Sequence, residues 1–172
     1  MSYYVVDVEA DWEYPIDGSL VCFGAVKVIP EFDVTFYGQT APISEKWNPE
    51  ALAISGFTRE QHEKFHDPSY VMNDFVGWVE ATTVGKPIFI SDNPAFDWMF
   101  MCTYMHKFAG RNPFGWSARR IGDLWCGMEK DSYAKWKWMR EAIHDHNPVN
   151  DAMGNAQALL KMKEKGLKIS FK

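Results

Sequence analysis

The order of strand-like and helix-like runs constrains the fold of this chain more than any other feature. Three runs rich in apolar and β-branched residues, at positions 3–8, 20–29 and 33–37, have the composition of strands. Pro30 separates the second run from the third and suits a hairpin turn. Later in the chain, helix-like runs alternate with single strand-like runs. A meander followed by such an alternation predicts an α/β domain in which a mixed sheet is flanked by helices.

Four of the predicted helices begin with an Asn-Pro or Asp-Pro pair, which supplies a capping side chain and a residue suited to the first helical turn. Thr58 and Gln61 have the spacing of a capping box and predict a further short helix. Positions 87–91 and 120–125 are predicted strands, and positions 128–142 are expected to be helical in part. The four pairs are Asn48-Pro49, Asp67-Pro68, Asn93-Pro94 and Asn147-Pro148.

The length of 172 residues suits a single domain spanning positions 1–172. Apolar residues make up 47% of the chain and charged residues 24%, which is a globular profile and not a disordered one. Cys22, Cys102 and Cys126 show no paired metal-binding spacing and are expected to be reduced, buried thiols. We expect no signal peptide and no membrane span, so the predicted location is cytoplasmic.

Charge is distributed unevenly along the chain. Residues 1–100 contain 16 acidic and 5 basic side chains, whereas residues 101–172 contain 7 and 13. The net charge of −5 would by itself argue against nucleic-acid binding. The uneven distribution allows both an acidic site that binds cations and a basic region that binds phosphates, although lysine-rich C-terminal segments are also common as ordinary surface.

Asp7 and Glu9 stand at the end of the first predicted strand. Side chains at positions i and i+2 share one face of a strand, so we expect the two carboxylates to be neighbours. They would repel each other in a dry setting unless a cation lay between them. Solvated acids at a strand end produce the same pattern, and Asp11 and Glu13 are interpreted in that way, as solvated loop residues.

Two further groups of polar residues follow helix caps. Asp97 lies in the first turn of the helix that begins at Pro94, where an acid also stabilises the helix dipole by about 0.3–1 kcal/mol. His146 precedes the last helix, and Asp151 lies in its first turns. A capped helix beside a surface histidine produces the same pattern. His144 has the wrong spacing to Asp151 and is interpreted as a loop residue.

Taken together, the order and spacing of these residues resemble the DEDDh 3′→5′ exonucleases. The shared pattern is Asp-x-Glu on the first strand, Asn-x-x-Phe-Asp after a middle strand, and His and Asp separated by four residues at the last helix. The family includes ribonuclease T, oligoribonuclease and the proofreading subunit of bacterial replicative polymerases. The resemblance extends from Val5 to Leu160, with supporting matches at positions 54–58 and 121–124. It implies an RNase H-like fold, and the compact size resembles the small stand-alone exoribonuclease branch.

The resemblance implies a two-metal active site. Asp7, Glu9, Asp97 and Asp151 would hold two Mg²⁺ or Mn²⁺ ions, the cations that oxygen ligands favour. Asp7 would bridge both ions, and His146 would deprotonate the attacking water. The product would be a nucleoside 5′-monophosphate released from a free 3′ end.

The resemblance also suggests how the substrate is held. Trp12 would stack on the terminal base and Phe57 would wedge against the next one, although core packing explains Phe57 equally well. Asn93 would help to position the 3′ end, or would cap a helix. Relatives often act as homodimers in which the basic patch of one subunit holds the substrate of the other. The basic residues expected to contact phosphates are Arg119, Arg120, Lys135, Lys137 and Arg140.

Three functions stay open on the sequence alone. Removal of nucleotides from single-stranded RNA 3′ ends is favoured, with the same chemistry on DNA as an alternative, because only a contact to the 2′-OH separates the two substrates. The third is a catalytically silent nucleic-acid-binding module. Pro148 favours this third function because it stands where the family pattern has alanine and could displace His146, although proline fits a first helical position. The complete set of acids argues against it.

Overall fold

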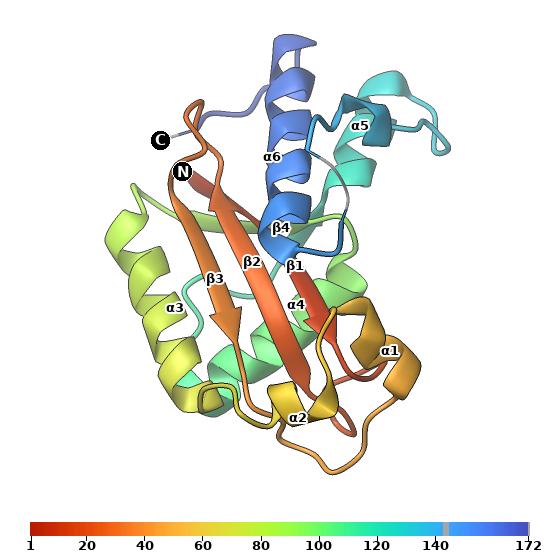
Figure 1. Cartoon of the computed structure of the whole chain (residues 1–172). Helices are drawn as coiled ribbons and strands as arrows, with labels where there is room; N and C mark the ends of the chain where they lie inside the picture. Colours follow the sequence, from red (N-terminus) through yellow and green to blue (C-terminus); the bar gives the residue numbers. More distant parts are fainter. Residues whose placement is uncertain (143–144, 172) are drawn as a thin grey trace.

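The computed structural model describes residues 1–142 and 145–171, so His144 lies outside the described residues. Its centre is a five-stranded sheet in the order β3-β2-β1-β4-β5 (Figure 1). The first three strands pair antiparallel, whereas β1 pairs parallel with β4 and β4 pairs parallel with β5. This topology confirms the predicted mixed sheet. The strands are β1 (Ser2–Ala10), β2 (Leu20–Lys27), β3 (Thr35–Gln39), β4 (Pro87–Ser91) and β5 (Ala118–Arg120).

The helices begin where the cap and proline pairs predict. Four of them have proline in the first turn, and the predicted capping box at Thr58 and Gln61 is present. No helix in the described ranges is long and apolar enough to cross a membrane. The helical segments are α1 (Pro49–Ile54), α2 (Arg59–His62), α3 (Pro68–Thr82), α4 (Pro94–Tyr104), the π-helix η1 (Met105–Ala109), α5 (Ile121–Glu129), the 3₁₀ turn η2 (Lys137–Met139) and α6 (Pro148–Glu164).

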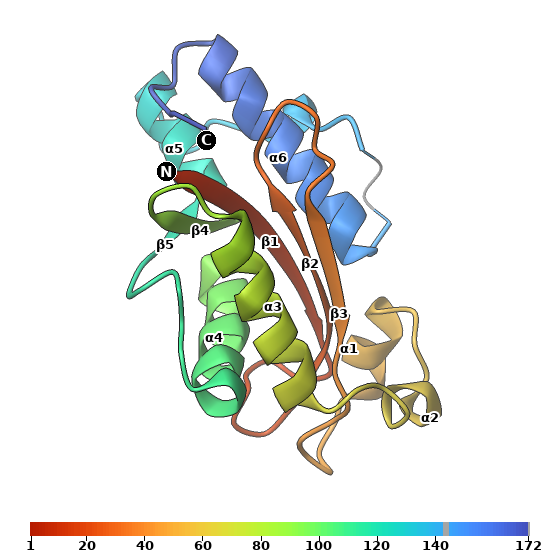
Figure 2. The ribbon, with the colours of Figure 1, turned by 90° about the vertical axis from the view of Figure 1, so that its left-hand side faces the viewer.

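The sheet separates two apolar layers. Helices α3 and α4 cover one face, and α6 crosses the other (Figure 2). Alternate residues of β1 pack into the two layers, because successive side chains of a strand point to opposite faces. Tyr4 and Val6 belong to the α3–α4 cluster, and Tyr3 and Val5 belong to the α6 cluster. By the same alternation, Asp7 continues the row of Tyr3 and Val5, on the face that α6 covers.

The predicted strand at positions 120–125 is wrong. Strand β5 ends at Arg120, and α5 begins at Ile121. Ile121 and Trp125 are both buried and stand four residues apart, so they occupy one face of a helix. A short apolar run suits a strand or a buried helix equally, and the packing of α5 against α6 selects the helix here.

The three cysteines are free thiols. Cys22 on β2 is buried, as expected. Cys102 and Cys126 are only half-buried, so the expectation of burial is wrong for these two. Both lie on helices at positions that face partly outward, a property that a single residue type cannot reveal.

Candidate active site

Asp7 and Glu9 lie near the end of β1, both half-buried. Asp7 stands opposite Gly24 of β2 and Glu9 stands opposite Cys22. The regular pairing between β1 and β2 is interrupted just after Glu9. Asp7 and Glu9 are two residues apart on one strand, so both carboxylates face the layer that contains α6.

Gly24 allows the N-terminus of α6 to approach the sheet closely. A Cβ atom at Gly24 would lie 2.4 Å from the carbonyl carbon of Pro148 and from the amide nitrogen of Val149. Asn147 caps the helix by accepting a hydrogen bond of 3.1 Å from the amide of Val149. The first turn of α6 therefore lies directly on β2, and this contact brings the buried Asp151 to the end of β1.

Asp97 reaches the same place from the other layer. It lies in the first turn of α4, directly after β4, and its side chain accepts a hydrogen bond of 3.2 Å from the amide of Asn93. Burial raises the pKa of Asp97 to about 7. Asn93 occupies the cap position, but its side chain forms no capping hydrogen bond within the described part of the chain. The helix-cap alternative for the Asn93 side chain is therefore not realised.

The pKa of Asp7 shows that the other three acids lie close to it. Burial raises this pKa well above its ordinary value, and the neighbouring charges of Asp97, Asp151 and Glu9 raise it further. The guanidinium group of Arg140 opposes these charges and lowers it. Four carboxyl groups from β1, α4 and α6 thus lie in one electrostatic neighbourhood, although up to 144 positions separate them in the sequence. Such a cluster is costly without cations, which would neutralise it.

His146 faces this cluster from the loop before α6. Its Nδ1 lies 3.7 Å from Oε1 of Glu9, and Glu9, His146 and Asp151 each offer a ligand atom within 4.8 Å of the others. Asp145 holds the loop by accepting hydrogen bonds of 3.0 Å from the amide of Asn147 and 2.9 Å from Asn150 Nδ2. His146 has a φ of 60°, in the left-handed region. Pro148 therefore does not remove the histidine from the acids.

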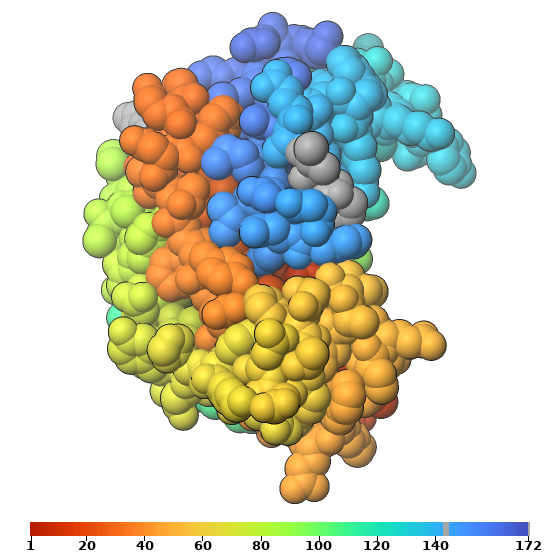
Figure 3. Space-filling view, in the orientation of Figure 1, coloured from red at the N-terminus to blue at the C-terminus, as the bar shows by residue number. Residues whose placement is uncertain are grey.

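Two hollows flank the cluster. One, of about 210 Å³, is lined by Glu9, Trp12 and Phe96 among others. The other, of about 170 Å³, is lined by Phe57 and His146. In Figure 3 a cleft separates the blue side, which contains α6, from the gold side, which contains α1, and red atoms of the N-terminal strand are visible in it. Trp12 thus shares a hollow with Glu9, and Phe57 shares a hollow with His146.

The position of Phe57 is compatible with both of the roles considered from the sequence. Its ring packs edge-on against Phe65 at a centroid distance of 5.0 Å, beside the small cluster that includes Val21 and Leu52. It is nevertheless only half-buried, and its exposed side lines the hollow beside His146. Core packing and contact with a ligand are therefore compatible for this residue.

Of the two arginines at the end of β5, only Arg120 lies beside the site. Its Nε donates a hydrogen bond of 3.2 Å to the carbonyl oxygen of Asp92, which directly follows β4. Lys137 and Arg140 also bind Asp92, with nitrogen–oxygen distances of 2.6 and 3.3 Å to Oδ2. Arg119 instead lies over the ring of Tyr3, near the opposite end of β1.

The interpretation of Asp11 as a solvated loop residue is wrong, whereas Glu13 is exposed as expected. Asp11 is fully buried, and it accepts hydrogen bonds from the amide of Ser19 and from Arg59 Nη1, the latter at 3.2 Å. Burial raises the pKa of Asp11 to about 6, and these donors counteract the rise, so the carboxyl group is mainly ionised at pH 7. The backbone oxygen of Asp11 also accepts from the amide of Asn48 at 2.8 Å. Asp11 thus attaches the α1–α2 segment to the end of β1.

Asp11→Ala should lower the free energy of unfolding by about 3 kcal/mol, because it removes the buried carboxylate that accepts hydrogen bonds from the amide of Ser19 and from Arg59. For a chain of this size the melting temperature should fall by roughly 6–12 °C. Glu13→Ala, two positions further on, is the matched control and should leave thermal unfolding unchanged. An Asp11→Ala melting curve that overlays that of the Glu13→Ala variant would show that the ion pair does not anchor the segment.

Comparison with known proteins gives one sequence relative and several similar structures. No family model matches the chain. Over 165 residues the chain is 31% identical to the 3′-5′ DNA exonuclease Cap18 of Escherichia coli, a match that covers 88% of this chain and 86% of Cap18. Cell-death related nuclease 4 (CRN-4) superimposes with a TM-score of 0.75 at 14% identity, covering 97% of this chain and 65% of that protein.

Two further solved structures have the same fold. A full-length 3′-exonuclease matches with a TM-score of 0.75 at 16% identity, covering 98% of this chain and 84% of its own. The zinc-bound form of the E. coli ExoI complex with single-stranded DNA matches with a TM-score of 0.72 at 16% identity, and this chain spans only 41% of it.

Proposed function

Because the chain belongs to the DEDDh family of 3′→5′ exonucleases, we propose that it shortens single-stranded DNA from the 3′ end and releases nucleoside 5′-monophosphates. The observation that supports this proposal most strongly is the convergence at the end of β1. Asp97 of α4 and Asp151 of α6 both raise the pKa of Asp7 on β1, and His146 lies next to Glu9. Acids that only cap helices or end strands would not be expected to cluster in the folded protein.

The donor set fits divalent cations. Carboxylate oxygens are the ligands that Mg²⁺ and Mn²⁺ prefer. Burial and then repulsion from the neighbouring acids raise the pKa of Asp7, and bound positive charge would relieve that repulsion. Asp7, Glu9, Asp97 and Asp151 would hold the ions. When bound, a pair of such ions supplies charge stabilisation to the attacking and leaving oxygens of an in-line displacement.

The remaining residues have roles that the cleft supports. His146 would accept the proton of the attacking water, because imidazole is the side chain most often used as a general base at neutral pH. The hollow beside Trp12 would receive the terminal base, and Phe57, in the hollow beside His146, would contact the next one. The amide side chain of Asn93, which forms no capping hydrogen bond among the described residues, would help to position the 3′ end.

The preference for DNA over RNA is supported by the sequence relative and not by the geometry of the site. The relative Cap18 carries the name of a DNA exonuclease, which favours DNA. The preference for RNA that we expected from the sequence stays a prediction, as do a cytoplasmic location and a homodimer. Matched DNA and RNA oligonucleotides of one sequence, labelled at the 5′ end and incubated with Mn²⁺ or Mg²⁺, separate the two substrates by their rates.

The same assay tests the proposed function. A ladder of shortened products that disappears in EDTA is expected. If neither oligonucleotide is shortened with either cation, the proposal fails and the silent binding module takes its place. Calorimetry with Mn²⁺ distinguishes the two further, because a module without a functional site should show no heat that depends on the carboxylates.

Gly24→Ala should lower turnover by roughly 10- to 100-fold while the protein stays folded. The added methyl group would lie about 1 Å too close to the backbone of Pro148 for an ordinary contact. The first turn of α6 must shift, and a displacement of about 1 Å in a catalytic group can cost about two orders of magnitude. The measurement is the initial rate of product formation at saturating substrate.

Gly77→Ala is the matched control. Gly77 lies inside α3, and a Cβ atom there would meet nothing within 4 Å. This variant should retain full activity and gain up to about 1 kcal/mol in stability from the better helix propensity of alanine. A Gly24→Ala enzyme as active as the Gly77→Ala enzyme would show that the close approach of α6 is unnecessary.

A further inference from the structure

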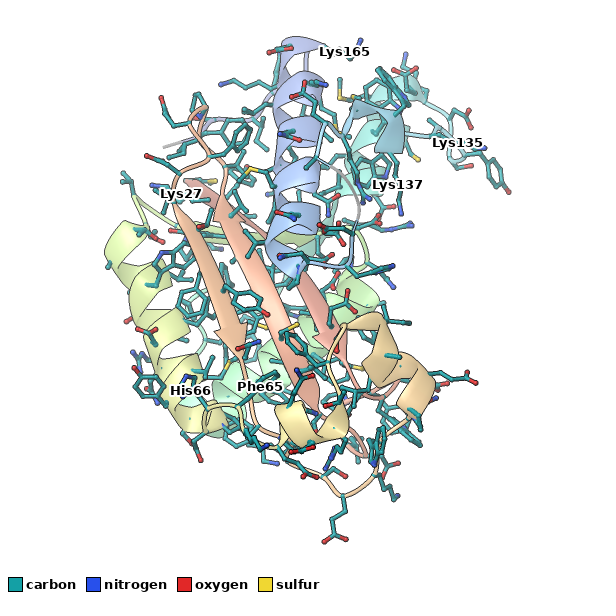
Figure 4. The ribbon with its side chains drawn as sticks, viewed as in Figure 1. Lys27, Phe65, His66, Lys135, Lys137 and Lys165 are labelled. Atoms are coloured by element: carbon teal, nitrogen blue, oxygen red, sulfur yellow. The ribbon has the colours of Figure 1, made fainter. Side chains whose placement is uncertain are left out.

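A basic and aromatic segment lies beside the cleft on the side of α6. Residues 135–140, with the sequence Lys-Trp-Lys-Trp-Met-Arg, contain three cations and no acid. Lys165 at the end of α6 joins them, because its Nζ lies 5.4 Å from the ring centre of Trp138. Figure 4 shows Lys135, Lys137 and Lys165 on the same side of the molecule. We call residues 135–140 together with Lys165 the basic ledge.

Trp138 is exposed but firmly held. Its side chain is 62% exposed, whereas the neighbouring Trp136 is buried. The indole N–H of Trp138 donates a hydrogen bond of 2.9 Å to the carbonyl oxygen of Lys135, and Trp125 packs edge-on against the ring. An exposed aromatic ring offers a face on which an unpaired base can stack. A ring that is already fixed loses little conformational freedom when a partner stacks on it.

The ledge is attached to the edge of the active site. Lys137 and Arg140 both bind the carboxylate of Asp92, and the charge of Arg140 reaches Asp7. Two residues of extended chain span at most about 7 Å, so the backbone of Trp138, which carries the exposed ring, lies close to that of Arg140. A strand that leaves the acids past Arg140 would therefore meet Trp138 within a few nucleotides.

Among residues 1–142 and 145–171, the acids only partly neutralise the charge of the ledge. One carboxylate, Asp92, serves both Lys137 and Arg140, and the adjacent Glu141 is paired with Lys161 of α6 at 2.7 Å. A hollow of about 250 Å³ opens between the ledge residues, lined by the segment from Ala134 to Lys137. In a chain of net charge −5, such a surface attracts phosphates locally while the rest of the molecule repels them.

We infer that the basic ledge is the docking surface for the part of a single-stranded nucleic acid that lies several nucleotides 5′ of the scissile bond. Trp138 provides a stacking platform for an unpaired base, and Lys135, Lys137 and Lys165 contact the phosphates around it. This inference rests on the proposed function, and it assigns to that function a contact that short substrates cannot make. Alternating cations and an aromatic ring are the pattern by which single strands are held without sequence preference.

The test compares the oligothymidylates dT2 and dT12, because only the longer one can reach the ledge. Trp138→Ala should raise the KM for dT12 about tenfold, leave its kcat within twofold, and leave both parameters for dT2 unchanged. Trp138→Phe should restore most of the affinity for dT12. Lys135→Ala should lower the slope of log affinity against log salt for dT12 by about 0.7, the value for one single-strand phosphate contact.

Trp116→Ala is the matched control, because Trp116 is 93% exposed and lies on the loop that enters β5, at the strand end opposite Arg120. It should change nothing for either substrate. Equal changes of KM for dT2 and dT12 in Trp138→Ala, or no change for either, overturn the inference. Unchanged DNA binding by Trp138→Ala together with altered sedimentation also overturns the inference, because the ledge would then be a contact between copies of the chain.

Failure of the proposed function can be distinguished from failure of the docking surface. If the wild-type protein cleaves neither oligonucleotide, anisotropy of 5′-fluorescein dT12 in Ca²⁺ still measures the ledge. A tenfold weaker binding by Trp138→Ala then supports the docking surface, and equal binding by both proteins overturns it.

Discussion

Asp7→Asn should lower exonuclease activity at least a thousandfold and yet leave the protein as stable as the wild type in EDTA, or more stable. Asp7 is the acid that the other three surround, so its charge is the one most needed to hold cations. The loss of about 4 kcal/mol of transition-state stabilisation corresponds to about three factors of ten in rate. The measurement is the rate of shortening of a 5′-labelled oligonucleotide in Mn²⁺.

Stability should change in the opposite direction for an electrostatic reason. The pKa of Asp7 in the folded protein is raised above its ordinary value, so the ionised carboxylate opposes folding. That penalty is absent when the group is protonated, and it grows as the pH rises through the raised pKa. A neutral amide removes the penalty at pH 8 in the absence of metal. Thermal unfolding in EDTA at pH 8 should therefore give a melting temperature for Asp7→Asn at or above that of the wild type.

Addition of Mn²⁺ completes the comparison. A cation that binds only the folded state stabilises it, so the wild-type melting temperature should rise and that of Asp7→Asn should rise much less. Asp33→Asn, at an exposed acid on the loop before β3, should behave as the wild type throughout. A fully active Asp7→Asn enzyme, or one that gains as much stability from Mn²⁺ as the wild type, would remove Asp7 from the cation site.

His146→Ala should reduce turnover about a thousandfold while leaving affinity for Mn²⁺ nearly intact. General base catalysis contributes about 10²- to 10⁴-fold, and Nδ1 of His146 lies 3.7 Å from Oε1 of Glu9. Its side chain is half exposed on a loop, so its removal should not disturb the core. The measurement is kcat at saturating oligonucleotide, together with a Mn²⁺ titration by calorimetry.

Two variants separate the role of a base from the role of a metal ligand. Asp151→Asn should lower both turnover and Mn²⁺ affinity, because Asp151 would be a ligand. His106→Ala, at an exposed histidine on η1, should lower neither. If His146→Ala weakens Mn²⁺ binding as strongly as Asp151→Asn does, the histidine is a ligand and not the base. If it keeps full turnover, another group accepts the proton.

The sequence alone determined the local parts of this protein. Asn93-Pro94 and Asn147-Pro148 predicted where α4 and α6 begin, because proline suits the first helical turn at both helices and the capping hydrogen bond of Asn147 acts within one turn. The spacing of Asp7 and Glu9 predicted that both carboxylates share one face of β1, since the side-chain period of a strand is two. Motif order then indicated which of these local features belong together.

Only the tertiary structure decided which distant groups touch, and at what distance. The absence of a side chain at Gly24 lets α6 lie against β2, and the folded chain brings the buried Asp11 within hydrogen-bond distance of Arg59. The exposure of Trp138 beside the cleft likewise depends on how α5 and α6 pack around its ring. The physical reason is that periodicity and capping depend on neighbours along the chain, whereas burial and the interaction of charges depend on segments that only folding brings together.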